Sequence, residues 1–403
     1  MKLVASYLPI FVARIGSGAS AFLVVKLASG GQIEAGVVLA AYPFLEALGA
    51  LVAGRWSDVF GRKKTLVIGY VVRSLAMLAL AWAFYSRGAP LLEALLNGII
   101  GFTTAFILTA SLAMATDLTE VRNRGVGMGG FEFINLGSYG VGYLLGSLFY
   151  TLFSNATAYL IVALLTAAAT PVFAKFLFET RLVAPGEGKF LFSALPPTAV
   201  ALLPVWLALT TIIGMAMYAP RVLRVGGHQI VGRIGENIAV GLLFIGALAL
   251  LGLGAVFFGR LADKWGRVKV FRLGLLGGLG ALLMLNAALH VGLGPVEAIA
   301  VTAPLLFLTS AIGPSILALV GDEADVRYRG TVMGIYSVML GLGIGFGSLL
   351  AGFVSAAFHG AEIQGLAAAA LGVYAALSAL HLVLNNFKKA VEPTRGVALR
   401  EVY

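Results

Sequence analysis

Apolar residues follow one another in long stretches along the whole chain, and short segments between the stretches carry most of the charged residues. Twelve of these stretches have about 20 residues, the length that an α-helix needs to cross roughly 30 Å of hydrocarbon. They are residues 4–28, 34–54, 65–85, 92–116, 126–150, 157–178, 197–220, 237–258, 270–290, 296–321, 331–357 and 363–386. The pattern predicts an all-α membrane protein with twelve transmembrane helices.

Composition favours a membrane protein over a soluble one. Of the 403 residues, 60% are hydrophobic and 11% are charged, whereas soluble domains carry about 25% charged residues. The mean hydropathy is +0.97. Lys2 and the apolar run behind it also fit a cleaved signal peptide, but the run continues to Val25, which favours a helix. The absence of Cys excludes disulfides and thiolate metal sites.

Lysine and arginine are distributed unevenly between the two sides of the predicted bundle. If the chain starts in the cytoplasm, 21 of the 28 basic residues fall in cytoplasmic segments and five fall in external loops. Basic residues collect on the cytoplasmic side of membrane proteins. The distribution predicts a multi-pass protein of the cell (plasma) membrane with both termini in the cytoplasm. The net charge of +10 is then an orientation signal and does not indicate a nucleic-acid partner.

One charged segment, residues 179–196, lies near the middle of the chain and is too short to fold as a domain. It divides the chain into an N-terminal six-helix bundle (1–178), a cytoplasmic linker (179–196) and a C-terminal six-helix bundle with a short cytoplasmic tail (197–403).

Two pairs of motifs recur at one offset of 205 residues. Residues 54–64 (GRWSDVFGRKK) match 259–269 (GRLADKWGRVK), and residues 117–130 (DLTEVRNRGVGMGG) match 322–335 (DEADVRYRGTVMGI). Because two separate motifs share the offset, the chain contains a duplication of six helices with both copies in the same orientation.

These motifs resemble those of the major facilitator superfamily. The family's loop sequence G-x-x-[AS]-D-x-x-G-R-[RK] is matched by residues 54–63, with Trp56 in place of the usual Leu and Val59 in place of a frequent basic residue. The second pair of motifs resembles the family's [DE]-x-x-P-x-x-x-R-G element, with Glu120 and Asp325 replacing the proline. The resemblance covers the whole chain and implies two pseudo-symmetric six-helix bundles around a central cavity.

The resemblance also implies a cytoplasmic gate, because the loop Asp of each half in this family faces the start of a helix in the other half. Asp58 would then lie near Gly330 and Asp263 near Gly125, while Arg62 and Arg267 would meet Asp117 and Asp322. The predicted gate residues are Asp58, Arg62, Asp117, Arg124, Asp263, Arg267, Asp322 and Arg329. The alternative is that the basic residues only set topology and bind anionic lipid headgroups.

Four ionisable residues, Arg14, Glu46, Arg73 and Glu132, lie within predicted helices, where each charge costs about 2.5–3.5 kcal/mol. Their counterparts at the 205-residue offset are not ionisable: Ala219, Leu251, Gly278 and Ser337. We expect Arg14 to bind an anionic or polar substrate, Glu46 and Glu132 to take up a coupling proton, and Arg73 to be a buried charge partner. The alternative is a structural network that pairs Arg14 with Glu46 and Arg73 with Glu132.

Other polar residues within the predicted helices are sparse. The expected substrate contacts besides Arg14 are Asn97, Thr104, Asn135, Tyr139, Tyr218 and Tyr336. Each of them also fits a hydrogen bond between helices. The second-half wall of the cavity is otherwise apolar, which favours an amphipathic or aromatic substrate over a sugar.

The sequence contains no metal-binding helix, phosphate-binding loop or nucleophile elbow, so we expect no enzyme activity, metal or other cofactor. It predicts a monomeric secondary transporter that moves a small anionic or amphipathic organic solute by alternating access, with proton symport. One alternative is proton-coupled efflux of hydrophobic compounds or drugs, although Asn97 stands where drug antiporters of the family usually carry an Arg. An alternative of another class is a non-transporting membrane sensor or assembly factor.

Overall fold

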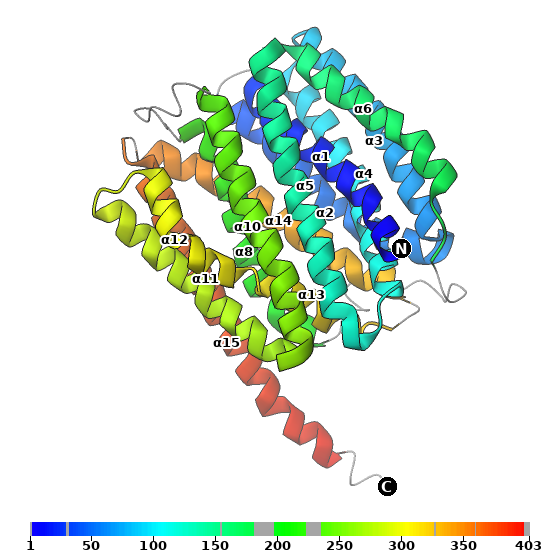
Figure 1. Ribbon diagram of the computed structural model, residues 1–403, viewed down its shortest axis with the longest axis vertical. Helices are drawn as coiled ribbons and strands as arrows, with labels where there is room; N and C mark the ends of the chain where they lie inside the picture. The colour runs from blue at the N-terminus through cyan, green and yellow to red at the C-terminus, as the bar shows by residue number, and fades with distance from the viewer. Residues whose placement is uncertain are drawn as a thin grey trace.

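The computed structural model describes residues 2–29, 32–153, 155–180, 197–222, 235–325, 328–358 and 360–398. The described residues form long α-helices joined by short connections, and they contain no strand. The helices, shown in Figure 1, are α1 (Lys2–Leu27), α2 (Gln32–Phe60), α3 (Arg62–Tyr85), α4 (Pro90–Asp117), α5 (Arg124–Phe153), α6 (Ala156–Phe176), α8 (Pro197–Val222), α10 (Glu236–Trp265), α11 (Arg267–His290), α12 (Pro295–Thr309), α13 (Ile312–Glu323), α14 (Arg329–Ala357) and α15 (Glu362–Ala398). A short 3-10 turn, η1 (Val121–Asn123), precedes α5.

Every predicted span corresponds to helix in the structure. Among the described residues, eleven segments are long and apolar enough to cross a membrane. The twelfth is α5, which has 30 residues and carries Arg124, Glu132 and several glycines. The chain is therefore an all-α membrane protein of twelve crossings, as the sequence predicts. The last helix is longer than expected, because α15 continues to Ala398 into the predicted tail.

The tenth crossing consists of two helices, α12 and α13. Pro314 has no N–H group and cannot donate to the carbonyl of Ser310 four residues earlier. Just before the proline, the N–H groups of Ser310 and Ala311 donate to carbonyls three residues earlier, Phe307 O (3.2 Å) and Leu308 O (3.1 Å), as in a 3-10 turn. The span 296–321 is thus interrupted at mid-crossing, a feature that the apolar pattern alone did not indicate.

Helices α1–α6 and α8–α15 form two bundles that meet along two helix pairs. Across the boundary, α5 packs along α10 and α2 packs along α14. A Cβ added at Gly129 of α5 would lie 2.5 Å from the carbonyl oxygen of Ala255 in α10, so the glycine permits this close approach. The predicted domain boundaries stay a prediction, since residues 181–196 of the predicted linker lie outside the described residues.

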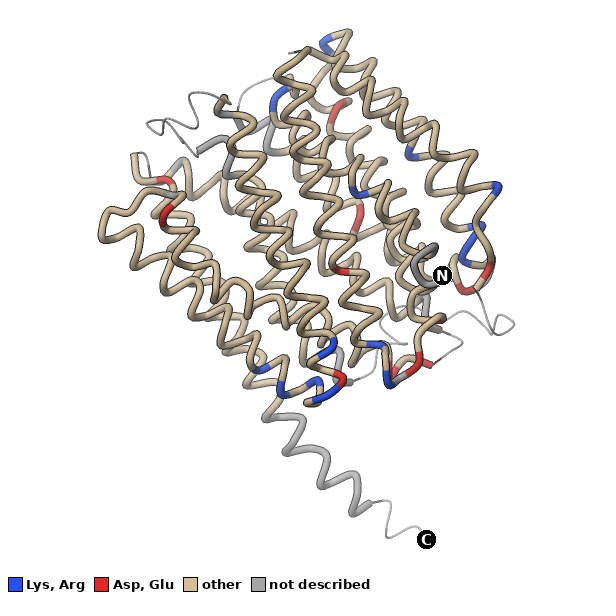
Figure 2. Tube along the Cα trace, viewed as in Figure 1, with Lys and Arg blue, Asp and Glu red and all other residues tan. Residues whose placement is uncertain are grey.

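The motifs that recur at the 205-residue offset lie together at one end of the helices, which we call the motif end. The chain begins at this end and α15 leaves the bundle there (Figure 1). Lys and Arg positions gather at the motif end, whereas few charged positions lie within the bundle (Figure 2).

The outer surface of the helices is apolar. Leu75, Trp82, Leu91 and Phe353 are each more than 60% exposed. Exposed apolar area of this kind costs about 25 cal/mol per Å² in water and nothing comparable in lipid. The bundle is therefore suited to a bilayer.

Candidate functional site

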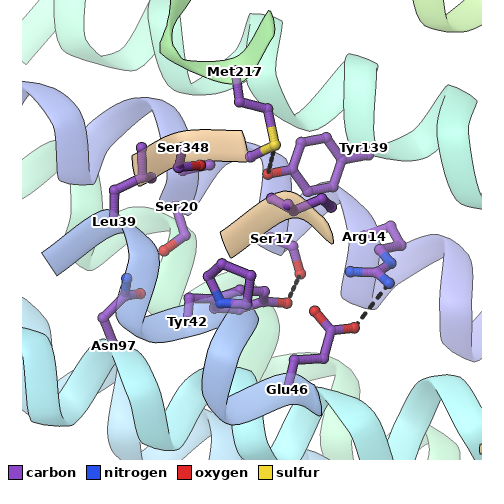
Figure 3. A pocket seen from close by; sticks show the side chains of 13 residues that line it. Arg14, Ser17, Ser20, Leu39, Tyr42, Glu46, Asn97, Tyr139, Met217 and Ser348 are labelled. Atoms are coloured by element: carbon purple, nitrogen blue, oxygen red, sulfur yellow. Dashed lines mark hydrogen bonds and ion pairs between the residues drawn. The ribbon is translucent and has the colours of Figure 1, made fainter. Parts of the chain in front are cut away.

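A cavity, which we call cavity 1, lies between α1, α2, α4, α5, α8 and α14. Figure 3 shows the side chains around it, with Arg14 of α1 and Glu46 of α2 pointing toward each other at one side. From these two residues the cavity extends away from the motif end, toward Leu39, Met217 and Ser348. Cavity 1 therefore has a charged end, and its remainder combines apolar side chains with hydroxyl and amide groups.

Arg14 and Glu46 form an ion pair at the charged end of cavity 1. The Nη2 atom of Arg14 donates to Oε1 of Glu46 at 3.0 Å, and both side chains are at most 5% exposed. Nε of Arg14 donates to Oδ1 of Asn135 in α5 at 2.7 Å. No described residue accepts a hydrogen bond from Nη1 of Arg14, and none donates to Oε2 of Glu46. Each partner thus retains one polar atom for a ligand or a proton.

Arg73 of α3 is fully buried, and no carboxylate of the described residues pairs with it. It donates to Oγ1 of Thr104, to the carbonyl of Ala13 (3.1 Å) and to Oγ of Ser17 (3.1 Å), and Ser17 lines cavity 1. Of the two pairs in the structural alternative, Arg14 with Glu46 is present, but Arg73 with Glu132 is not found among the described residues. Because Arg14 and Arg73 together face one carboxylate, the surroundings of cavity 1 carry an excess of positive charge when all three groups are ionised.

A second cavity, cavity 2, lies between α5 and the second bundle. Glu132 lines it and is 6% exposed. Tyr336 of α14 lines the same cavity, and no Lys or Arg nitrogen of the described residues lies within 4.0 Å of the Glu132 carboxylate. Trp206 of α8 and the break between α12 and α13 complete the wall.

Hydrogen bonds lead from the charged end of cavity 1 to the wall of cavity 2. Beyond the Glu46–Arg14–Asn135 bonds, Nδ2 of Asn135 donates to the hydroxyl of Tyr336 at 2.7 Å, and Tyr336 lines cavity 2 together with Glu132. The Arg14–Glu46 pair is therefore linked across the boundary between the bundles to a residue of cavity 2.

The other predicted substrate contacts fall into two groups. Asn97 and Tyr139 line cavity 1; Asn97 donates to the carbonyl of Val38 at 2.7 Å. Thr104 and Tyr218 line neither cavity: Thr104 accepts from Arg73, and Tyr218 is packed in the hydrophobic core. The structure thus gives Thr104 and Tyr218 no direct contact with either cavity.

At the motif end, two carboxylates cross the boundary between the bundles. Oδ2 of Asp58 accepts from the backbone N–H and the hydroxyl of Thr331, both at 2.7 Å. Asp263 accepts from the backbone N–H groups of Gly125 (3.1 Å) and Val126 (3.0 Å). Each acid satisfies N–H groups in the first turn of a helix, where the helix dipole also favours negative charge. The two contacts are related by the 205-residue offset.

Arginines surround these contacts. Arg62 pairs with Asp58 (2.5 Å) and Asp117 (3.2 Å) within the first bundle. Arg124 of the first bundle donates to Asp322 (2.8 Å) and to the carbonyl of Gly321 (3.0 Å) of the second.

Arg267 pairs with Asp322 and with Asp263 (3.5 Å), while the side chain of Arg329 lies outside the described residues. The motif end of the described structure is thus closed by polar contacts.

The sequence analysis missed several participants. Tyr42 lies one helical turn before Glu46, lines cavity 1 and is hydrogen-bonded to Ser17 at 2.9 Å; the i, i+4 spacing from Glu46 is the signal that identifies it. Glu179 accepts from the N–H groups of Arg62 (2.9 Å) and Lys63 (3.2 Å) and so caps α3. Trp206 gives no sequence signal, because an aromatic residue in an apolar helix resembles its neighbours.

Twelve crossings in two bundles, with buried charges at cavities along the boundary, are features of the transporter class of membrane proteins. The sequence model of the Major Facilitator Superfamily matches residues 6–231 and 233–401. The chain therefore belongs to the Major Facilitator Superfamily, and it is a transporter of small molecules rather than an enzyme.

Individual relatives differ in cargo. The chain is 24% identical over 362 residues to Multidrug resistance protein 2 of Bacillus subtilis (strain 168), covering 86% of each chain. It is 31% identical over 159 residues to Inorganic phosphate transporter 1-6 of Oryza sativa subsp. japonica, covering 38% of this chain and 28% of the relative.

Two solved structures show the same fold at 15% identity. The human organic anion transporter MFSD10 (TETRAN) superimposes with a TM-score of 0.72 and coverage of 94% of this chain and 98% of the other. The proton:xylose symporter XylE also has a TM-score of 0.72, with 96% of each chain covered.

Proposed function

We propose that this transporter moves a small anionic or amphipathic organic solute together with protons, by alternating access. The observation that carries the proposal is the ion pair of Arg14 and Glu46 in the wall of cavity 1, with a second buried cation, Arg73, behind it. Buried charges on this scale cost several kcal/mol, so a pathway for charged cargo explains their presence better than packing does.

Arg14 supplies the anchor for the solute in this proposal. Its Nη1 atom makes no hydrogen bond to a described residue, and a guanidinium binds carboxylates and phosphates through paired N–H donors. The excess positive charge of Arg14 and Arg73 over Glu46 favours an anionic head group. Leu39, Met217 and Ile344 line the remainder of the cavity and suit an apolar tail.

Glu46 and Glu132 supply the proton sites. A buried carboxylate near a guanidinium changes protonation with small changes in its hydration. An anion that binds Arg14 competes with Glu46 for the guanidinium, which favours proton uptake by Glu46. The hydrogen bonds from Arg14 through Asn135 to Tyr336 then extend this change toward cavity 2, which Glu132 lines.

Alternation in this proposal is rocking of the bundles 1–178 and 197–403 about their boundary, with residues 179–196 as the linker. The contacts of Asp58 and Asp263 form the gate that opens and closes at the motif end. The distribution of Lys and Arg supports a cytoplasmic motif end and a plasma-membrane location with both termini inside.

The test starts with a thermal-shift screen of organic anions, neutral compounds and cations across pH 5–8. Compounds that stabilise the protein are then assayed in proteoliposomes that contain a pH-sensitive dye, with and without a proton gradient. We expect an organic anion to enter with protons, faster when the outside is more acidic. Glu46→Gln and Glu132→Gln should each abolish proton-driven uptake; uptake that survives in both variants contradicts the coupling assignment.

Efflux of hydrophobic compounds by proton exchange is the second candidate. The relative named Multidrug resistance protein 2, which aligns over 86% of this chain, supports it, as does the apolar part of cavity 1. The same proteoliposomes separate the candidates, because symport accumulates solute on the side toward which protons flow, whereas exchange expels it from that side.

A further inference from the structure

Cavity 2 differs from cavity 1 in the sign of its charge. Among the described residues that line it are one carboxylate, Glu132, and two aromatic residues, Trp206 and Tyr336, but no Lys, Arg or His. Glu132 is 94% buried, since 6% of it is exposed, and it has no basic partner within 4.0 Å among the described residues. An ionised Glu132 therefore leaves cavity 2 with a net negative charge.

The aliphatic hydroxyl groups of the cavity wall, those of Thr210, Thr309 and Ser310, already use their hydrogens. Thr210 donates to backbone carbonyls of Trp206 (3.0 Å) and Met339 (2.9 Å). Thr309 donates to a carbonyl at 3.0 Å and Ser310 to one at 2.5 Å. What these side chains still offer a ligand is oxygen lone pairs, which accept hydrogen bonds. Together with Glu132, the threonine and serine side chains of the wall are acceptors, whereas the indole N–H of Trp206 is a donor.

Two aromatic residues, Trp206 and Tyr336, line the same cavity as Glu132. The ring centroids of Trp206 and Tyr336 are 5.4 Å apart with an interplanar angle of 60°, and both residues are at most 2% exposed. The face of an aromatic ring attracts an organic cation by about 0.5–2 kcal/mol. Leu136, Leu209 and Leu340 complete an apolar wall.

We propose that cavity 2 is a second binding site that takes an amphipathic organic ammonium ion, with the ammonium group on Glu132 and its apolar body against Trp206 and Tyr336. A primary ammonium supplies only donors and a positive charge, and Glu132 with the threonine and serine hydroxyls supplies a negative charge and acceptors. Cavity 2 and cavity 1 share no lining residue, although Glu132 is also a proton site in the symport proposed above, so amine binding and anion uptake are measured in separate assays.

Glu132 holds either a proton or an ammonium ion. The titratable side chains nearest to it are Tyr336 and, through Asn135, Arg14. A primary amine stays protonated between pH 5 and 8, since alkylammonium groups titrate near about 10. A loss of amine binding as pH falls through this range therefore reports proton uptake by the protein.

The test is a binding assay on the purified full-length protein in detergent, with three ligands of the same shape: 4-phenylbutylamine, 4-phenylbutanol and 4-phenylbutyrate. The chain has four tryptophans, and Trp56, Trp82 and Trp265 are 36%, 66% and 62% exposed at the outer surface. Replacing these three with Phe leaves Trp206 as a fluorescence reporter inside cavity 2.

We expect the amine to change the Trp206 emission saturably and to bind at least tenfold more tightly than the alcohol at pH 8. Glu132→Gln should weaken amine binding at least tenfold and leave alcohol binding unchanged, which also shows that the variant is folded. Glu132→Asp, which keeps the charge, should restore part of the affinity. The matched control Glu297→Gln changes a second-bundle carboxyl that does not line the cavity and should bind the amine normally.

Equal binding of amine and alcohol, tighter binding of 4-phenylbutyrate at this reporter, or unchanged amine affinity in Glu132→Gln would each overturn the proposal. None of these results bears on anion uptake through cavity 1, which the proteoliposome assay measures separately. Conversely, amine binding without any anion-coupled proton flux supports cavity 2 and contradicts the proposed symport.

Discussion

Neutralising the two carboxylates that cross the motif end should open that end of the bundle. In Asp58→Asn, the acceptor of the N–H and hydroxyl of Thr331 remains but its charge is lost. In Asp263→Asn, the same happens to the acceptor of the N–H groups of Gly125 and Val126. The double variant removes both of these carboxylate charges and keeps the shapes of the side chains.

The magnitude follows from the contacts that exist only while the bundles are closed. A hydrogen bond to a charged group contributes about 1.5–3 kcal/mol, against about 0.5–1.5 kcal/mol for a neutral one. Each variant therefore loses about 1 kcal/mol in each of two cross-bundle bonds. The Arg62–Asp58 pair lies within the first bundle and cancels between closed and open forms. A loss of about 2 kcal/mol per site changes the closed-to-open ratio roughly 30-fold.

The opening is measured as a distance between two spin labels at the motif end. Because the natural chain has no cysteine, Phe60→Cys and Val268→Cys introduce unique labelling sites, one in each bundle. Both positions are about half exposed, so the labels fit without repacking. The distance is measured by double electron–electron resonance. We expect a second, longer label-to-label distance, and the fraction of molecules that show it should rise from wild type to the single variants and again to the double variant.

Glu120→Gln is the control, since Glu120 is 74% exposed and pairs with Arg122 of the same loop. Its distance distribution should equal that of wild type. If the double Asp→Asn variant also gives the wild-type distribution, the carboxylates do not hold the bundles together, and the assignment of the gate fails.

Three further predictions concern the buried charges and the helix boundary. Arg73→Gln should destabilise the protein by about 1–3 kcal/mol, because Thr104, Ser17 and the Ala13 carbonyl lose a charged donor; a Tm in detergent equal to that of the surface control Arg122→Gln argues against this. Arg14→Gln should abolish thermal stabilisation by organic anions and Arg14→Lys should retain part of it, whereas anion binding that persists in Arg14→Gln removes the proposed anchor. Gly129→Val should force α5 from α10 at the Ala255 carbonyl, lowering the Tm and raising the long-distance fraction of the spin-label assay; wild-type values for both would show that the boundary tolerates a side chain there.

The sequence was sufficient to predict the crossings, and its resemblance to the Major Facilitator Superfamily implied the contacts at the motif end. Apolar stretches locate the helices because each must cross the same thickness of lipid. The 205-residue offset relates Asp58 to Asp263 and indicates that their contacts are equivalent. Figure 2 shows why the four interior charges were identifiable, since so few charged positions lie within the helices.

The lining of the cavities was less predictable. In a membrane helix both the lipid face and the packed face are apolar, so periodicity does not identify the inward side. Thr104 and Tyr218 were therefore expected at the cavity. In the structure, Thr104 accepts a hydrogen bond from Arg73, and Tyr218 packs in the hydrophobic core. The partner of Arg73 was also beyond the sequence, because neutral acceptors replace the carboxylate that pairing rules suggest.

The central claim is that the buried charges line a water-filled path for cargo, and cysteine reactivity tests it most directly. Ala21 lines cavity 1 near its apolar end, while Leu75 is 63% exposed on the outer face of α3. In proteoliposomes, Ala21→Cys should react with water-soluble methanethiosulfonates much faster than Leu75→Cys. Relative to their rates with a free thiol, the anionic sulfonate reagent should be favoured over the trimethylammonium reagent by roughly a few hundredfold. A unit charge about 10 Å away, seven residues along α1, at an effective dielectric of about 20 contributes about 1.7 kcal/mol, favourable for the anionic reagent and unfavourable for the cationic one. Equal, slow labelling of Ala21→Cys and Leu75→Cys, or a preference for the cationic reagent, would contradict the account.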